Sequence, residues 1–259
     1  MASNDRKIIA IGGGEIGRPR EDGNRFYPVE TTSIDKEILR LTNKKNAKLI
    51  FIPTASNDSR KYFDIVKNHF LKIGFASISV LYLLDKDLTK TQIKEAILSH
   101  DAIYVGGGNT LRMMSVWRKL EVDTLLKQAL DKGVVLSGIS AGSICWFSQG
   151  SSDSRSSASD VNKLMSVTGL GFIEAYLCPH YDVEPHRQSD VKIKLRRSAK
   201  VAICLDNCVA IEVIGDKYRI IKSKASAKAH KAYWKKNRYF VEEIVASDSF
   251  KGIANLLAR

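Results

Sequence analysis

A serine flanked by glycines is the residue of this sequence whose surroundings best suit covalent catalysis. Ser140 stands in the stretch GISAG (residues 138–142), which follows an apolar run at residues 134–137 and precedes a helix-like segment. This arrangement fits the nucleophile elbow, a strained turn between a strand and a helix that exposes a serine hydroxyl. The amide N–H of Ala141, at the start of the helix, would then point at a developing oxyanion. A structural turn explains the pattern equally well, so a catalytic Ser140 needs partners elsewhere in the chain.

Three consecutive glycines at residues 106–108 are a candidate for the second part of an oxyanion hole. They follow the apolar run 102–105, and their backbone amides could approach a substrate carbonyl without obstruction by side chains. A phosphate-binding loop or a tight turn is the alternative, both here and for the three glycines at residues 12–14. Neither run completes the G-x-G-x-x-G or Walker lysine pattern, so no nucleotide cofactor is predicted.

His180 is the histidine best placed to activate Ser140. It follows the apolar residues 175–178 and Pro179, and therefore lies at the carboxyl end of an expected strand. A base in that position could accept the serine proton. His186, six residues later, is a weaker alternative.

Four carboxylates are candidates for the group that orients the imidazole. Glu212 lies in the apolar run 208–214, where a carboxylate is out of place without a partner. Asp153 lies in a small, polar stretch after the Ser140 segment, and Asp182 and Glu184 lie close to His180 in the sequence. Spacing alone does not choose among the four.

The elements that must position these residues alternate between strand-like and helix-like segments. Strands are expected at residues 7–12, 47–52, 76–83, 102–105 and 134–137, and helices at residues 33–42, 58–73, 89–99, 110–132 and from 141 onward. Continuous apolar strands alternating with helices predict a mostly parallel sheet sandwiched by helices. Sites in such sheets form at the carboxyl ends of the strands, where all three glycine-rich turns fall.

The remainder of the chain changes character after a polar loop at residues 150–160. Strand-like runs follow at residues 174–177, 201–205, 208–214 and 218–221, and a closing helix is expected at 249–257. The turn at 215–217 predicts a hairpin between the last two strands. No stretch reads as a linker, so we expect a single α/β domain over residues 1–259.

Composition limits the class of protein. Apolar residues make up 44% of the 259 residues, enough for a large core, and no run approaches the ~20 apolar residues of a membrane span. The polar N-terminus does not resemble a signal peptide, and the four cysteines favour buried free thiols over a disulfide framework or a zinc site. We therefore expect a cytoplasmic protein without a metal or other cofactor.

The net charge of +13 is concentrated near the C-terminus. Residues 217–239 carry nine Lys or Arg, no acid and several aromatic residues. A nucleic-acid surface is one interpretation. A solvated basic face is the favoured one, because no nucleic-acid-binding motif accompanies the charge. The pattern fits a monomer and a homodimer alike.

Four segments, in this order, resemble the dipeptidase E (aspartyl dipeptidase) and cyanophycinase family of serine peptidases. They are AIYVGGGNTLRMM, SGISAGSICWF, GLGFIEAYLCPHYD and LDNCVAIEV. The resemblance spans roughly residues 8–221. It implies a class I glutamine-amidotransferase-like, flavodoxin-like fold, here with a C-terminal strand hairpin, and peptide hydrolysis through a catalytic triad.

The resemblance also implies roles for individual residues. Ser140 matches the nucleophile, His180 the base, and Gly107 or Gly108 together with Ala141 the oxyanion donors. The family's acidic member matches either Asp153 or Glu212; we favour Glu212, because a rigid strand would position it better.

The substrate implied is a small peptide, with Asp-X dipeptides as the specific expectation. Arg187 and Arg155 are the candidates for holding the aspartate carboxylate, and Asn109 is a further substrate-binding candidate. Two alternatives stay open. An amidotransferase-like enzyme would need a cysteine at the elbow, and Cys145 is five residues too far along the chain. A non-catalytic binding protein would use the basic segment.

Overall fold

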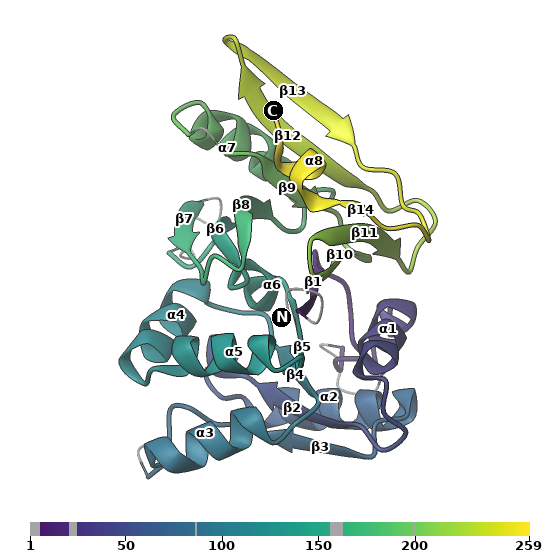
Figure 1. The fold of residues 1–259 in the computed structure, drawn as a ribbon, viewed down its shortest axis with the longest axis vertical. Helices are drawn as coiled ribbons and strands as arrows, with labels where there is room; N and C mark the ends of the chain where they lie inside the picture. Colours follow the sequence, from purple (N-terminus) through teal and green to yellow (C-terminus); the bar gives the residue numbers. More distant parts are fainter. Residues whose placement is uncertain (1–5, 21–24, 86, 156–162, 199) are drawn as a thin grey trace.

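A computed structural model describes residues 6–20, 25–85, 87–155, 163–198 and 200–259 (Figure 1). Within these residues the chain forms two sheets. The larger has the strand order β14-β11-β10-β1-β5-β4-β2-β3. Its parallel strands are β1 (Lys7–Ile11), β2 (Lys48–Ile52), β3 (Ser77–Val80), β4 (Ala102–Val105) and β5 (Val135–Ile139). The antiparallel strands β10 (Val209–Ile214), β11 (Lys217–Lys222) and β14 (Lys251–Gly252) continue it on one side.

Helices cover both faces of this sheet (Figure 1). On one face lie α1 (Thr32–Thr42) and α2 (Arg60–Ile73), and on the other lie α3 (Lys90–Leu98), α4 (Thr110–Lys119) and α5 (Val122–Asp131). Because successive side chains of a strand point to opposite faces, Ile9 and Ile11 pack in the cluster of α1 and α2, whereas Ile8 and Ala10 pack in the other. Burial on both faces explains why the strands read as continuous apolar runs.

The second sheet has the order β13-β12-β9-β8-β6-β7 within the described part of the chain. Its strands are β6 (Phe147–Ser152), β7 (Met165–Thr168), β8 (Ile173–Cys178), β9 (Ala202–Leu205), β12 (Ala229–Lys235) and β13 (Arg238–Glu243). One face shares a large apolar cluster with the first sheet, through Leu177 and Ile203. The other face is covered by α7 (Pro185–Leu195), whose Val191 packs with Tyr176 and Cys178. The two sheets therefore share one apolar core within the described residues.

The α/β class predicted from the sequence is confirmed, and the differences lie in the second half of the chain. The segment after Ser140 is only a short helix, α6 (Ala141–Ile144), followed at once by β6. The polar stretch expected as a loop belongs to β6 up to Ser152, and its residues 156–160 lie outside the described residues. The C-terminal hairpin is present, because β10 and β11 pair antiparallel. The predicted closing helix is shorter, as α8 (Ile253–Leu257).

The basic segment is mostly β structure. Its residues form β11, β12 and the start of β13, so its lysines and arginines are spread over both sheets. Among the described helices, none has the length and apolar character needed to span a bilayer. All four cysteines are buried free thiols.

Candidate active site

Ser140 occupies a strained turn between β5 and α6. Its backbone angles are φ 55° and ψ −115°, a conformation that residues with a side chain rarely adopt. The flanking glycines are required by the closeness of neighbouring backbone. A Cβ at Gly138 would lie 2.2 Å from the carbonyl oxygen of Gly142, and a Cβ at Gly142 would lie 2.1 Å from that of Val105. The GISAG pattern is therefore a nucleophile elbow in geometry as well as in sequence.

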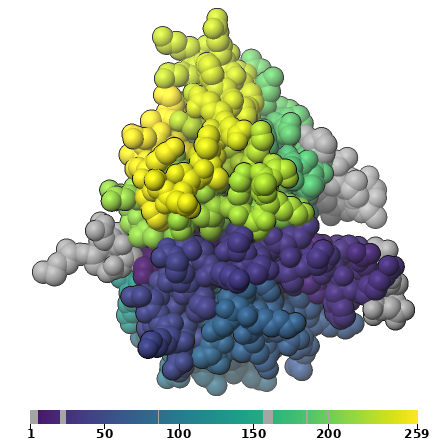
Figure 2. Space-filling model, turned by 90° about the vertical axis from the view of Figure 1, so that its right-hand side faces the viewer, coloured from purple at the N-terminus to yellow at the C-terminus, as the bar shows by residue number. Residues whose placement is uncertain are grey.

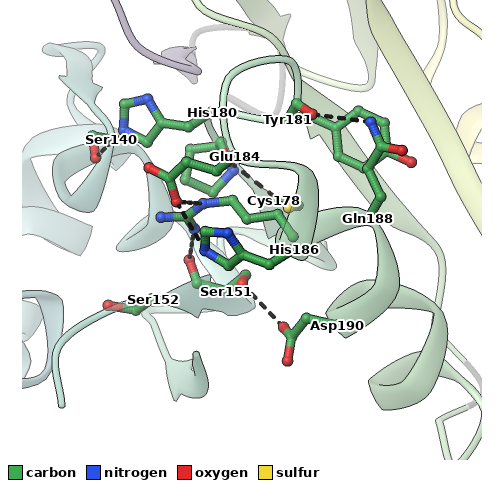
Figure 3. A network of polar contacts seen from close by, with 12 residues as sticks. Ser140, Ser151, Ser152, Cys178, His180, Tyr181, Glu184, His186, Gln188 and Asp190 are labelled. Atoms are coloured by element: carbon green, nitrogen blue, oxygen red, sulfur yellow. Dashed lines mark hydrogen bonds and ion pairs between the residues drawn. The ribbon is translucent and has the colours of Figure 1, made fainter. Parts of the chain in front are cut away.

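His180, after β8 of the second sheet, lies beside Ser140, after β5 of the larger sheet (Figure 3). Its Nε2 lies 2.8 Å from the Oγ of Ser140. His180 follows β8 and Pro179, also has a positive φ of 54°, and donates its backbone N–H to the carbonyl oxygen of Gly12 at 3.3 Å. The turn at the carboxyl end of β8 thus aims the imidazole at the elbow. A serine hydroxyl and an imidazole at this distance have the geometry that a nucleophile and its base need.

Asn207 is the residue that orients the imidazole in this geometry, and the sequence analysis missed it. The Nδ1 of His180 lies 2.7 Å from the Oδ1 of Asn207. An amide oxygen only accepts hydrogen bonds, so this contact places the proton on Nδ1 and leaves the lone pair of Nε2 facing Ser140. Asn207 is itself fixed, because its backbone N–H donates to the Oδ1 of Asp182 at 2.9 Å.

A signal for Asn207 was present in the sequence. It lies just after β9, at the edge of the sheet where His180 also lies, and inside the segment LDNCVAIEV that carries the family resemblance. A polar residue that follows the carboxyl end of a buried strand is a candidate site residue, whether or not it is charged. Restricting the search to carboxylates excluded it.

Glu212 does not contact His180, so the favoured expectation for the orienting group is wrong. Its Oε2 accepts a hydrogen bond from the Nε of Arg219 at 2.6 Å, and its Oε1 lies 3.7 Å from the Nη2 of Arg40. The cause is strand geometry. Glu212 is paired with Ile9, in the middle of β1, and its side chain joins arginines beside α1, away from the sheet edge that holds Ser140.

The three carboxylates nearer to His180 also have other roles in the structure. Asp153 is an exposed side chain that lines the same pocket, and in the described residues no hydrogen bond joins it to His180. Asp182 binds the backbone of Asn207, and Glu184 binds Arg187. The second expectation, that Asp153 orients the base, is therefore not supported by the contacts.

The environment of His180 keeps the imidazole neutral. Burial lowers its pKa below the usual value, and the charge of Arg187 acts in the same direction. The hydrogen bond with Asn207 and the carboxylates of Glu184 and Asp153 oppose this lowering. A neutral imidazole near pH 7 is the form that can accept a proton from Ser140.

The glycines at residues 12–14 make room for the histidine and asparagine pair. A Cβ at Gly13 would lie 2.0 Å from the Oδ1 of Asn207 and 2.4 Å from the Nδ1 of His180. Gly12 accepts the backbone N–H of His180, and Gly13 accepts that of Cys208. These contacts explain why glycines occupy this run, and no bound phosphate is needed to explain them.

The candidate oxyanion donors differ in their availability. Gly107 passes close to Ser140, since a Cβ at Gly107 would lie 3.5 Å from the Cβ of Ser140, but its N–H is directed at the hydroxyl of Tyr62 at 3.4 Å. Gly108 lines the pocket. Ala141 begins α6, where the first amides of a helix have no intrahelical acceptor. Gly108 and Ala141 are thus better placed than Gly107.

A pocket of about 330 Å³ opens at Ser140. It is lined by Gly108, Asn109, Ser140, Asp153, Ser154, His180, Glu184 and Arg187.

Arg187, on α7, is only 3% exposed. Its Nε donates to Glu184 at 2.6 Å, and its Nη1 donates to the carbonyl oxygen of Ser151 at 3.0 Å. These two bonds fix the guanidinium at the wall of the pocket.

The other residues predicted to bind substrate are less directly placed. The side-chain amide of Asn109 caps α4 by accepting from Arg112 and donates to the carbonyl oxygen of Ser154 at 2.9 Å, so it shapes the pocket wall. Arg155 is exposed and does not line the pocket among the described residues. The Nε2 of His186 lies 3.5 Å from the Oε2 of Glu184, within ion-pair distance, and His186 is not a lining residue of the described pocket.

Two alternative chemistries lack residues in the described part of the chain. The thiol of Cys145 is buried, donates to the carbonyl oxygen of Gly142 at 3.1 Å, and has a pKa that burial raises well above the usual value, so it cannot replace Ser140 as nucleophile. No group of three or more His, Cys, Asp or Glu side chains in the described ranges could hold a metal ion.

Comparisons with known proteins agree with this geometry. The family model described as Peptidase family S51 matches residues 25–221. The uncharacterized peptidase YgaJ of Bacillus subtilis is 33% identical over 233 residues, which cover 87% of this chain and 91% of that protein. The uncharacterized peptidase PM1590 of Pasteurella multocida is 30% identical over 156 residues, or 58% of this chain and 73% of that protein.

Two solved structures have the same fold. A peptidase from an acI-B1 Actinobacterium has a TM-score of 0.68 at 17% identity, covering 95% of this chain and 96% of that one. A putative peptidase E from Listeria monocytogenes EGD-e has a TM-score of 0.58 at 18% identity, covering 84% and 98% respectively.

Proposed function

This chain belongs to peptidase family S51 and is a peptidase, and from that premise we propose that it hydrolyses small peptides by acyl transfer at Ser140. The observation that carries the proposal is the row Ser140–His180–Asn207, joined by contacts of 2.8 and 2.7 Å. This is the arrangement of nucleophile, base and orienting group that peptide hydrolysis by serine requires, with an amide in the third position.

The proposed reaction has two halves with His180 as the proton carrier. The Oγ of Ser140 attacks the scissile carbonyl carbon while its proton moves to the Nε2 of His180. The imidazolium then donates that proton to the leaving amine as the C–N bond breaks, and an acyl-enzyme forms. Water then attacks the ester while His180 takes its proton, and the imidazolium returns that proton to the Oγ of Ser140 as the C–O bond breaks and the acid product is released.

The neutral amide of Asn207 gives this triad a particular electrostatic balance. An amide oxygen fixes the tautomer but stabilises an imidazolium less than a carboxylate would. The nearby carboxylates of Asp153 and Glu184 raise the pKa of His180 without touching it, and so favour the charged intermediate from a distance. We assign the oxyanion to the amides of Gly108 and Ala141, since the N–H of Gly107 is directed at Tyr62.

The charges of the pocket are consistent with the finer proposal, hydrolysis of Asp-X dipeptides. The guanidinium of Arg187 could receive the side-chain carboxylate of an N-terminal aspartate. The carboxylate of Asp153, exposed at the same pocket, could receive the free α-amino group. A volume of about 330 Å³ is near the lower end of ligand pockets, which span roughly 300–1,000 Å³, and favours short substrates.

The test is a panel of dipeptides with matched side chains. Asp-Leu and Asn-Leu differ only in the charge at the position assigned to Arg187, and Ala-Leu reports the backbone alone. We expect Asp-Leu to be hydrolysed about 100-fold faster than Asn-Leu in kcat/KM, because the guanidinium N–H groups that Glu184 and Ser151 leave over can form charge-assisted hydrogen bonds with a carboxylate but not with an amide. In Arg187→Gln that preference should vanish while Ala-Leu changes little.

Ser140→Ala provides the control for the chemistry itself. It should lower kcat for every substrate at least about 10⁴-fold. Equal turnover by Ser140→Ala and the wild type would overturn the serine mechanism. Equal hydrolysis of Asp-Leu and Asn-Leu by the wild type would overturn only the Asp-X specificity.

A further inference from the structure

The strand β13 forms an outer edge of the second sheet, on a hairpin that it makes with β12 and that projects from the body of the protein (Figures 1 and 2). The hairpin lies beyond the residues matched by the family model. On β13, Phe240 is 37% exposed and Val241 is 45% exposed. An exposed edge strand with apolar side chains offers a row of backbone groups to which a second strand can pair.

The backbone of β13 has a defined outward face. The N–H of Ile244 donates to the carbonyl oxygen of Ala229 at 2.8 Å, so residue 244 directs its backbone groups inward. In an antiparallel pair this direction alternates, and therefore Tyr239, Val241 and Glu243 direct theirs outward. The register is fixed by a two-residue turn at Lys236 and Asn237, which both have positive φ.

We propose that β13 pairs with β13 of a second copy of this chain, antiparallel and centred on Phe240. The two strands are related by a twofold axis normal to the sheet. Paired residues must have their side chains on the same face, and side chains alternate along a strand, so the axis lies level with one residue, which pairs with its own copy, and not midway between two residues. In this register Tyr239 lies opposite Val241 of the partner subunit. These are outward-directed residues on both strands, and they can exchange backbone hydrogen bonds.

The charges of β13 are self-complementary in this register. Arg238 lies opposite Glu242 of the partner subunit, and the symmetry repeats the pair. Within its own hairpin Arg238 faces Lys235, a like charge, so the partner's carboxylate supplies the opposite charge that the cross-strand position lacks. Glu242 is held on this face, because its Oε1 accepts a hydrogen bond from the hydroxyl of Tyr233 at 2.5 Å.

The apolar side chains also match across the axis. Tyr233 and Phe240 are stacked, with ring centroids 5.3 Å apart and an angle of 16° between the rings. With Phe240 opposite Phe240 of the partner subunit, the stack extends into a row of four rings across both hairpins.

The alternative twofold register is poorer. Centring the pair on Val241 would place Arg238 opposite Ile244 of the partner subunit and would lose both ion pairs. Charges on an edge strand often serve to prevent pairing. Here, however, the twofold axis places the positive charge of Arg238 opposite the negative charge of Glu242 of the partner subunit, which favours pairing of two identical strands.

Sedimentation equilibrium of the full chain over a range of concentrations tests the proposal. The wild type should shift from 28.9 kDa towards twice that mass as concentration rises. Arg238→Glu and Glu242→Arg, each alone, should weaken the dimer about tenfold or more, because two attractions become two repulsions. The double variant Arg238→Glu/Glu242→Arg should return to wild-type affinity, since the pairs are then swapped.

Mixing the two single variants tests the register without relying on a repaired protein. One chain then carries two acids and the other two arginines, so heterodimers should form although each variant alone is weakened.

Val241→Pro is a second test of pairing through this edge, because it removes an outward N–H that β12 does not use. Circular dichroism should show all variants folded.

Three outcomes would overturn the proposal: a wild type that is monomeric at every concentration, a dimer that single charge reversals leave unchanged, or single-variant defects that neither the double variant nor mixing repairs. A dimer that survives Val241→Pro would also contradict pairing through this edge.

Discussion

Asn207 and Glu212 lie five positions apart in the chain and illustrate two different uses of a polar side chain in this fold. Asn207 stands in the turn between β9 and β10 and contacts the imidazole of His180. Glu212 stands within β10, fully buried, and contacts Arg219 and Arg40. A carboxylate in an apolar strand therefore indicates a buried partner, which can be an arginine as readily as a catalytic histidine.

The difference follows from where each residue falls on its strand. Parallel strands deliver their carboxyl ends to one edge, and the residue just beyond that edge reaches the site whatever its charge. A residue in mid-strand reaches only the layer beside its own face, here the cluster of Glu37, Arg40 and Arg219 beside α1. Variants at the two regions should therefore separate activity from stability.

The largest expected effect is a loss of activity when a methyl group is added next to Asn207. In Gly13→Ala the new methyl group would overlap the contact between His180 and Asn207, and we expect a loss of about 100-fold or more in kcat/KM, with the fold retained. Gly252→Ala is the matched control, because the nearest atom to its Cβ would be 4.0 Å away. Dipeptide hydrolysis by both variants is the measurement, and equal activity of the two would contradict the placement of Asn207.

On the Glu212 side the effect should fall on folding. Glu212→Ala removes one of the two carboxylates that pair with Arg219 in a buried setting and leaves only Glu37, and should lower the free energy of unfolding by about 3 kcal/mol. Glu174→Ala, which breaks the exposed ion pair with Lys200, should cost under about 1 kcal/mol. Urea unfolding gives both values. A stable Glu212→Ala protein with abolished hydrolysis would return Glu212 to the catalytic group.

The smallest effect is a shift in pH dependence. The base works only when neutral, so kcat/KM should be full above the pKa of His180 and be lost as pH falls through it, at a pH below that of an ordinary histidine. Asn207→Asp should move this acid limb to higher pH, because a carboxylate favours the imidazolium. Glu212→Gln should not move it, and a shift in that variant instead would contradict the comparison.

Much of the fold could be read from the sequence. The five parallel strands and the helices on either face follow from apolar runs separated by amphipathic segments, and the helical segment expected at residues 110–132 is present as two helices, α4 and α5. The second sheet could not be read in the same way, because β12 carries lysines among its apolar residues and pairs not only with its neighbour β13 but also with β9, which lies well before it in the sequence. A strand's partner is a tertiary property that a local pattern does not contain.

The site could be predicted at the positions where the backbone conformation restricts the residue type. The glycines around Ser140 and the position of His180 after β8 mark the proposed nucleophile and base, and the structure brings these two side chains together. The orienting group was not found because the argument assumed a carboxylate. Tautomer control needs only an acceptor at Nδ1, and an amide oxygen meets that need.

Reaction with a fluorophosphonate tests the central claim, that Ser140, His180 and Asn207 form one catalytic unit, most directly, because it requires no knowledge of the substrate. Mass spectrometry of the labelled protein should show a single adduct on Ser140. The labelling rate should fall about 10- to 100-fold in Asn207→Ala and stay unchanged in Glu212→Gln. Labelling that persists in Ser140→Ala, or that slows in Glu212→Gln but not in Asn207→Ala, would contradict the account.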